Sequence, residues 1–205
     1  MFENDTLKQF IDKTAAPDAV PGGGSVSALA GALAAALAAM VAGFTLNKET
    51  FAAVAPQMET LRQNAADLQS KLLAAVDRDS ESYQAVLAAF RLPKGTQTEI
   101  QARTAAIQEA FKGACRVPLQ VAEMAGQAAD LAVQAARDGN PDLITDAGVS
   151  ALLARAAGLG ALMNVRINLA AINDDNLVAQ MDQKIKQIKQ YIIEKEQKIL
   201  EIFPV

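Results

Sequence analysis

Histidine is absent from this chain of 205 residues, and cysteine occurs once, as Cys115. The missing histidine excludes the Ser-His and Cys-His pairs of nucleophilic catalysis, the usual zinc sites and the Glu-x-x-His motif of di-iron bundles. A single cysteine also excludes an intramolecular disulfide. Any acid–base chemistry therefore falls to aspartate, glutamate, lysine, tyrosine or the backbone.

Aromatic residues are scarce as well, at 4% of the chain, although 51% of the residues are hydrophobic. A core of alanine and aliphatic side chains favours closely packed helices over sheets, which are rich in β-branched and aromatic residues. The formal net charge is −4. We expect no strongly basic surface and therefore no nucleic-acid partner.

The first residues, MFENDTLKQFIDK, are amphipathic and lack the charged and then apolar pattern of a signal peptide. Together with the single cysteine, this pattern leads us to expect a cytoplasmic protein. Residues 25–46 form an apolar run long enough to span a bilayer, but alanine and glycine supply most of it. We expect the central helix of a soluble bundle here, and no membrane partner.

Hydrophobic periodicity and chain breakers predict an all-α fold, a bundle of five to six helices. The expected helices cover roughly residues 5–14, 25–45, 54–90, 98–137, 146–172 and 176–202. Asn4 or Asp5 is the expected cap of the first helix, and Pro118 is expected to kink the fourth. The sixth carries a narrow stripe of isoleucines, which indicates an outer helix of the bundle or of a dimer.

The turn Pro-Gly-Gly-Gly-Ser at residues 21–25 opens the uncharged, alanine-rich helix. Three glycines at a helix start leave backbone N–H groups uncovered, which suits an anionic or polar ligand edge. The turn is neither a P-loop nor a dinucleotide fingerprint, because it lacks the Gly-Lys-Ser/Thr ending and no strand precedes it. Two interpretations stay open. Gly22, Gly23, Gly24 and Ser25 form a ligand site, or they form a tight turn in which Ser25 caps the helix.

A carboxylate interrupts the apolar stripe of the third expected helix. Asp79 occupies the position that completes the stripe between Val76 and Tyr83, in a row with steps of three and four residues that ends at Phe90. Burial of a carboxylate costs several kcal/mol or raises its pKa. Asp79 is therefore a candidate general acid–base or a counterion for a cation. The alternative is a buried carboxylate satisfied by a neighbouring Ser, Tyr or Lys.

The residues next to Asp79 in the sequence do not belong to this apolar stripe. Asp77, Arg78 and Glu81 are expected on a solvated face of the same helix.

The fifth expected helix carries a second set of polar residues. Asn164 and Asn168 follow Gly160 at spacings of four and eight, so that both amides lie on one apolar face. They either bind the amide edges of a heterocycle or bridge helices. Asp146, at the start of this helix, is either a cap or part of the stripe that continues through Val149.

Lys94 follows the break at Pro93 and is either a last-turn cation or a contact for a substrate carboxylate.

In their order along the chain, these motifs resemble those of one family. The matching segments are AAP at 15–17, PGGGSV at 21–26, VDRDSESY at 76–83, LPK at 92–94, VPL at 117–119, GN at 139–140, TD at 145–146 and NVRINL at 164–169. The chain is similar to the C-terminal domain of formiminotransferase-cyclodeaminase and to stand-alone methenyltetrahydrofolate cyclohydrolases. The similarity covers nearly the whole chain, so we expect a single domain over residues 1–205.

The resemblance implies an all-α homodimer with a folate site near the subunit interface, a tetrahydrofolate derivative as substrate, and neither a metal nor a tightly bound cofactor. Asp79 matches the catalytic carboxylate of the family. The residues expected to bind the substrate are Gly22, Gly23, Gly24, Ser25, Lys94, Asp146, Asn164 and Asn168.

Two reactions are then open, hydrolysis of 5,10-methenyltetrahydrofolate to 10-formyltetrahydrofolate and release of ammonia from 5-formiminotetrahydrofolate. We expect the first, because the chain carries no formiminotransferase segment. A protein of another class, a non-catalytic helical assembly module, is the further alternative, and the aspartate at position 79 argues against it.

Overall fold

The computed structural model describes residues 1–203, and within them every regular element is a helix. The all-α prediction is confirmed, and each expected helix is present. The elements are η1 (Phe2–Asn4), α1 (Leu7–Ala15), α2 (Gly23–Leu46), η2 (Glu49–Val54), α3 (Ala55–Phe90), α4 (Gln97–Asp138), η3 (Pro141–Leu143), α5 (Ile144–Leu169) and α6 (Asp175–Ile202).

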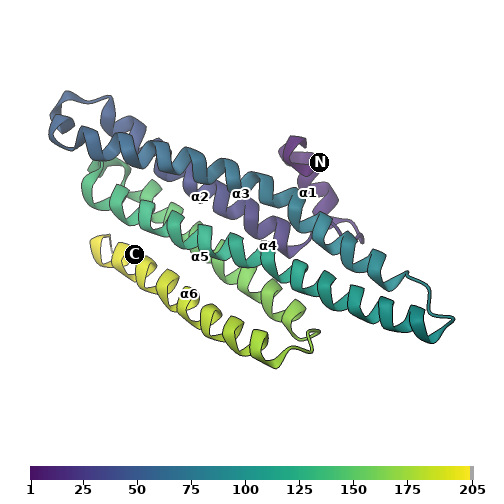
Figure 1. Ribbon diagram of the computed structural model, residues 1–205. Coiled ribbons are helices and arrows are strands. Elements are labelled where there is room, and N and C mark those ends of the chain that lie inside the picture. The colour runs from purple at the N-terminus through teal and green to yellow at the C-terminus, as the bar shows by residue number, and fades with distance from the viewer. Residues whose placement is uncertain (204–205) are drawn as a thin grey trace.

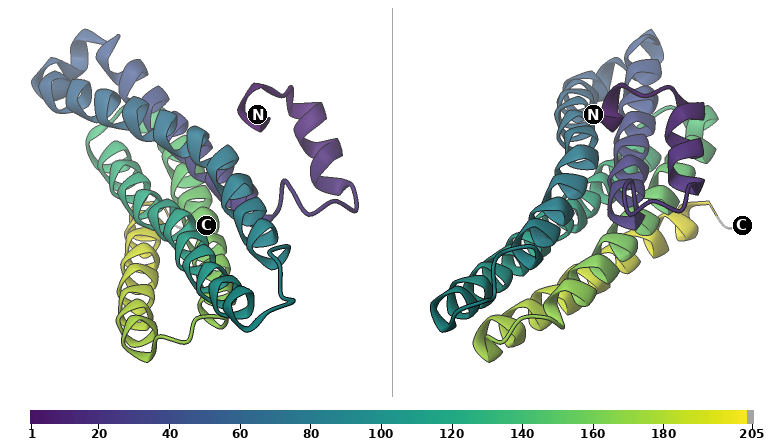
Figure 2. Two further views of the ribbon diagram at one scale, coloured as in Figure 1. Left: turned by 45° about the vertical axis from the view of Figure 1, so that its right-hand side comes forward. Right: turned by 90° about the vertical axis from the view of Figure 1, so that its right-hand side faces the viewer.

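Four long helices form the body of the molecule. α2 packs against α3 and α5, and α4 packs against the same two helices from the other side. α6 lies outside this group against α4 and α5, as Figures 1 and 2 show. The stripe residues Ile185, Ile192 and Ile199 are buried there, so the interpretation of the last helix as an outer bundle helix is confirmed.

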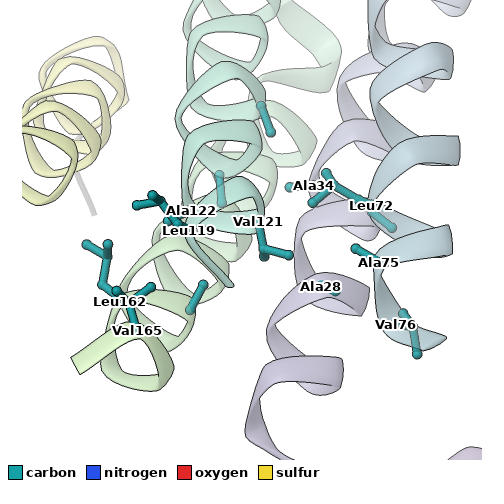
Figure 3. Packing of buried hydrophobic residues seen from close by; sticks show 14 of the residues in the cluster. Ala28, Ala34, Leu72, Ala75, Val76, Leu119, Val121, Ala122, Leu162 and Val165 are labelled. Carbon is teal, nitrogen blue, oxygen red and sulfur yellow. The ribbon is translucent and has the colours of Figure 1, made fainter. Parts of the chain in front are cut away.

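Small side chains fill the core, as the composition predicts. Figure 3 shows alanine, valine and leucine side chains from α2, α3, α4 and α5 in the core between the helices. α5 and α6 approach even more closely at Gly158, where an added methyl group would lie 2.2 Å from the Ile192 side chain. Close approach of helix backbones replaces aromatic bulk as the source of packing density.

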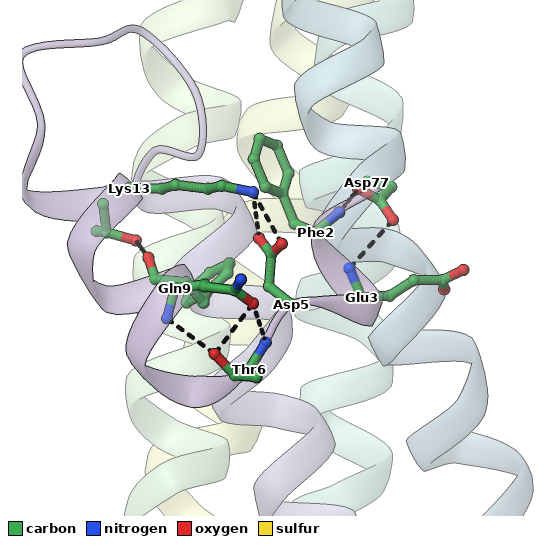
Figure 4. Close-up of polar contacts among 9 residues, drawn as sticks. Phe2, Glu3, Asp5, Thr6, Gln9, Lys13 and Asp77 are labelled. Atoms are coloured by element: carbon green, nitrogen blue, oxygen red, sulfur yellow. Dashed lines mark hydrogen bonds and ion pairs between the residues drawn. The ribbon is translucent and has the colours of Figure 1, made fainter.

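The N-terminus is attached differently from the expectation. Thr6, rather than Asn4 or Asp5, caps α1, in a reciprocal pair with Gln9: the Thr6 Oγ1 accepts the Gln9 N–H at 3.2 Å, and the Gln9 Oε1 accepts the Thr6 N–H at 2.8 Å (Figure 4). The prediction of the cap was wrong because the glutamine three residues on completes a capping box with Thr6 alone.

Asp77 is buried, which corrects the expectation of a solvated face. Its carboxylate accepts the backbone N–H groups of Phe2 at 2.5 Å and of Glu3 at 3.3 Å (Figure 4). The η1 turn folds back onto α3 and covers this position, a long-range contact that no local pattern predicts. Arg78 and Glu81 are exposed, as expected.

One side of the molecule remains apolar and exposed. We call it the α2–α5 apolar face, and it consists of Val26, Leu33, Met40 and Phe44 of α2 and of Val149, Leu152, Met163 and Ile167 of α5. α2 is central, as predicted, but it is not enclosed on every side. By length and composition, Gly23–Leu46 and Pro141–Leu169 are each apolar enough to cross a membrane, although 44% of the most apolar window of each is buried.

Candidate active site

Asp79 lies directly against the N-terminus of α2. A methyl group added at Gly24 would come within 2.1 Å of its Oδ1 atom, so only glycine at this position admits the carboxylate. The Ser25 Oγ lies 3.1 Å from the other carboxylate oxygen, and the Ser25 backbone N–H also hydrogen-bonds to Asp79. The N-terminus of α2, with the positive end of its helix dipole, therefore faces a carboxylate of the protein itself.

Burial raises the pKa of Asp79 above the usual aspartate range. The hydroxyl and the N–H of Ser25 act in the opposite direction, because both hydrogen-bond to the carboxylate. The side chain is half-buried and makes no ion pair among the contacts of residues 1–203. A carboxyl group with a raised pKa is better suited to take and return a proton than a fully solvated aspartate is.

Asp79 opens into a cleft of about 430 Å³ formed by the glycine turn and by α3, α4 and α5. The glycine turn closes one side and the second half of α3 another, while α4 and α5 supply the rest. The volume lies in the range of small-molecule sites. The lining residues are Ala19, Val20, Gly22, Gly23, Gly24, Asp79, Ser82, Tyr83, Val86, Leu87, Phe90, Phe111, Ala114, Asn164, Ile167 and Asn168.

The aromatic residues of the α3 stripe line this cleft instead of the core. Tyr83 is 42% exposed and Phe90 45% exposed, and Phe90 meets Phe111 of α4 edge to face with ring centroids 6.1 Å apart. The expectation that the stripe stays in the core as far as Phe90 was wrong. A core and a cleft wall produce the same periodicity, so sequence alone could not separate them, and it gave no signal for Phe111.

Both asparagines of α5 line the cleft, and Asn168 also joins α5 to α4. The Asn164 Nδ2 donates to the Gly160 carbonyl at 2.9 Å, and the Asn168 Nδ2 donates to the Ala114 carbonyl of α4 at 2.9 Å. The bridging interpretation is therefore confirmed for Asn168. The positions remain compatible with ligand contact, because both residues line the cleft next to the glycine turn.

Three of the expected substrate residues do not line this cleft: Ser25, which is fully buried beside Asp79, and Lys94 and Asp146. Lys94 is exposed in the loop after α3 and does not line it. Asp146 lies in the first turn of α5, about 27 Å along the helix from Asn164 at 1.5 Å per residue. One chain thus brings together Asp79, the glycine turn, Asn164 and Asn168, but not Asp146.

Other reactive groups lie away from the cleft. Cys115 is buried in the core, where burial raises its pKa to about 11. Within residues 1–203, no three histidine, cysteine, aspartate or glutamate side chains come together as a metal site. Asp79 is the one carboxylate that lines the cleft in this part of the chain.

Comparison with known proteins bears on this arrangement. The family model of formiminotransferase-cyclodeaminase matches residues 6–187. The chain belongs to this family. Among its relatives, the methenyltetrahydrofolate cyclohydrolase of Methylorubrum extorquens is 34% identical over 194 residues, which are 95% of this chain and 92% of that protein.

Formimidoyltransferase-cyclodeaminases are longer members of the family. The rat protein is 35% identical over 185 residues, and this chain spans about a third of its length, 34%. The fold is shared with the crystal structure of formiminotetrahydrofolate cyclodeaminase from Thermotoga maritima, at a TM-score of 0.89 and 30% identity, over 98% of this chain and 97% of that one.

Proposed function

We propose that this protein hydrolyses 5,10-methenyltetrahydrofolate to 10-formyltetrahydrofolate, with Asp79 as the acid–base group. The observation that carries the proposal is the half-buried Asp79 carboxylate, held at the α2 N-terminus in a cleft of small-molecule size. The similarity to a cyclohydrolase over nearly the full length of both chains supports the choice of reaction.

The chemistry needs one proton to be taken and returned. Water attacks the cationic carbon that bridges N5 and N10, and Asp79 accepts a proton from that water. The tetrahedral adduct then collapses to the formyl group with cleavage of the bond to N5. Asp79 returns its proton to the departing nitrogen, and the hydroxyl proton of the adduct is released to solvent, so the cationic substrate gives a neutral product and one proton. Before attack, the carboxylate stabilises the positive charge of the substrate, so a single group serves each step.

The second candidate is a formimidoyltetrahydrofolate cyclodeaminase, which the similarity to the Thermotoga maritima enzyme favours. Here N10 attacks the formimino carbon on N5 and ammonia leaves, giving 5,10-methenyltetrahydrofolate. Asp79 moves a proton from N10 to the departing nitrogen. Both reactions pass through a tetrahedral carbon between N5 and N10, so the same cleft serves either one.

In this proposal the folate ring lies against the glycine turn, between Asn164 and Asn168. The polar edges of both amides and the N–H groups at Gly22, Gly23 and Gly24 suit the amide edges of a reduced pterin. The reaction involves neither a tightly bound cofactor nor a metal. Lys94 and Asp146 stay predicted substrate contacts.

We also propose that the protein is a cytoplasmic homodimer with no membrane or nucleic-acid partner. The α2–α5 apolar face supports the homodimer, since its eight apolar side chains belong to two adjoining helices and α2 has no charged residue. Apolar patches of this extent are typical of interfaces. A second copy is the occupant we propose, because one face made from two neighbouring helices can pair with itself about a two-fold axis.

The deciding experiment follows the methenyltetrahydrofolate absorbance near neutral pH, with the non-enzymatic hydrolysis subtracted. We expect the protein to accelerate the decay, and Asp79→Asn to lower turnover roughly 10²–10⁴-fold while the fold is kept. Asp142→Asn, an exposed aspartate in η3, is the matched control. Full activity of Asp79→Asn would end the assignment.

Two other outcomes select the alternatives. If methenyltetrahydrofolate decays no faster with enzyme, but 5-formiminotetrahydrofolate gives rising methenyl absorbance and ammonia, the protein is the cyclodeaminase. If both assays are negative and tetrahydrofolate derivatives at saturation leave the melting temperature unchanged, the assembly module is the correct class.

A further inference from the structure

The hydroxyl group of Ser25 has more hydrogen-bond partners than it has protons. It is completely buried in the first turn of α2. Its Oγ lies 2.9 Å from the Val76 carbonyl oxygen, 3.1 Å from Asp79 Oδ2 and 3.2 Å from the Ser80 Oγ. A serine hydroxyl donates once and accepts through two lone pairs, so Val76 and Asp79 compete for one proton.

The protonation state of Asp79 decides this competition. An ionised carboxylate only accepts, and a hydrogen bond to it is roughly twice as strong as one to a neutral oxygen. The Ser25 proton therefore turns to Asp79 when that group is charged. When Asp79 is protonated, its own O–H donates to the Ser25 Oγ, and the Ser25 proton turns to the Val76 carbonyl.

Ser80 completes both arrangements. It is buried beside Ser25, and its hydroxyl can donate to the Ser25 Oγ whichever way the Ser25 proton points. No buried side-chain nitrogen or oxygen of residues 1–203 lacks a partner, which includes this group of three. Each state of Asp79 thus has a fully satisfied hydrogen-bond arrangement, reached by rotation about one C–O bond.

We propose that Ser25 is a positioning residue whose hydroxyl proton switches between the Val76 carbonyl and the Asp79 carboxylate, so that Asp79 can accept and return a proton without leaving a buried oxygen unpaired. The O–H bond of Ser25 stays intact throughout, and only the acceptor of its hydrogen bond changes. The inference rests on the proposed role of Asp79 and assigns Ser25 to the carboxylate rather than to the substrate.

Other charged groups do not account for the protonation behaviour of Asp79. α2 carries none, and within the described chain Tyr83 is the only other ionisable residue that lines the cleft. On α3, Arg78 and Glu81 are exposed. On the helices opposite, Arg166 of α5 lies 3.8 Å from Asp182, and Lys112 of α4 lies 3.3 Å from Glu109.

The test is a direct titration of Asp79 in the full chain, by ¹³C NMR of labelled aspartate with Asp79→Asn to assign the signal. Removal of the hydroxyl in Ser25→Ala should raise the pKa of Asp79 by about one to two units, since the charged form loses a charge-assisted hydrogen bond. Ser25→Cys, a weaker donor of similar size, should give an intermediate rise, and Ser80→Ala a smaller one.

Ser150→Ala is the matched control, because the Ser150 hydroxyl is equally buried and donates to the Ala34 carbonyl at 2.7 Å far from Asp79. It should leave the titration unchanged. In turnover, Ser25→Ala should lower kcat and shift the pH profile with Asp79, while KM stays within about twofold because Ser25 does not touch the substrate.

The inference would be overturned if Asp79 had the same pKa in folded Ser25→Ala as in the wild-type protein. If Ser25→Ala does not fold, an unchanged Asp79 pKa in folded Ser80→Ala and Ser25→Cys would overturn it. This readout needs no turnover. If Asp79→Asn keeps full activity but Ser25→Ala shifts the pKa of Asp79, only the proposed function is wrong. If Asp79→Asn is inactive but Ser25→Ala leaves the pKa of Asp79 unchanged, only the proposed switch is wrong.

Discussion

Asp79 is held in an environment that favours its neutral form, and the folded protein therefore binds its proton more tightly than the unfolded chain does. The cost to stability is absent below the ordinary aspartate value of 3.8, grows as the pH rises towards the raised pKa, and is constant above it. Removal of the charge should relieve this cost at neutral pH only.

We therefore predict that Asp79→Asn melts at a higher temperature than the wild-type protein at pH 7, although it is inactive. The difference should shrink as the pH falls towards about 4. Calorimetry across this range measures it. A variant that melts lower at pH 7 would show that the charged carboxylate stabilises the fold.

Gly24 is the residue that admits Asp79 to the helix end. An added methyl group would lie 2.1 Å from Oδ1, so Gly24→Ala should displace the carboxylate and lower turnover at least tenfold. Gly43→Ala on the same helix is the control, since nothing lies within 4 Å of its added methyl group. That change should keep activity and stabilise the protein by roughly 0.5–1 kcal/mol. Equal activities of the two variants would contradict the close approach.

At the scale of elements, α3 changes its role along its length. Its stripe is buried through Leu61, Leu72 and Val76, and then turns into the wall of the cleft from Asp79 onwards. The change occurs because α2 begins at Gly23 and leaves the second half of α3 without a neighbouring helix on that side. Beyond Asp79 the stripe residues Tyr83 and Phe90 are exposed in the cleft, while Val86 between them stays buried.

Asp77 of the same helix fixes the N-terminal segment, together with the apolar packing of Phe10. Asp77→Ala removes the acceptor of the Phe2 and Glu3 N–H groups and should release η1 and α1 at a cost of about 1–3 kcal/mol. Hydrogen exchange over residues 2–15 should accelerate, with α4 unaffected. Asp67→Ala, which removes an exposed pair with Lys71, is the control and should change little. Unchanged exchange in Asp77→Ala would mean that other contacts hold this segment.

At the scale of the whole molecule, a single chain leaves Asp146 and the cleft at opposite ends of α5. If Asp146 contacts the folate, a second copy has to bring it there, with its helices antiparallel across the α2–α5 apolar face. Sedimentation should then give twice the 21.6 kDa mass of the chain.

A mixture of two inactive variants tests this arrangement. Asp79→Asn and Asp146→Asn, refolded together, should recover about a quarter of the wild-type activity, because half of the dimers are mixed and each mixed dimer holds one intact site. Each variant refolded alone is the control. Mixed dimers without recovered activity would show that Asp146 takes no part in the site of another copy.

The sequence alone determined the helices, the alanine-rich core and the anomaly at Asp79, because periodicity, breakers and the composition of a close-packed interface are local properties of the chain. Only the tertiary structure decided that Asp79 meets Gly24 and Ser25, that Asp77 holds the N-terminus, and that Tyr83 and Phe90 line a cleft. Those contacts join residues far apart in the sequence, which local patterns do not predict. A stripe of apolar side chains indicates that one face of a helix is covered, but it does not indicate whether another helix or a ligand cleft covers it.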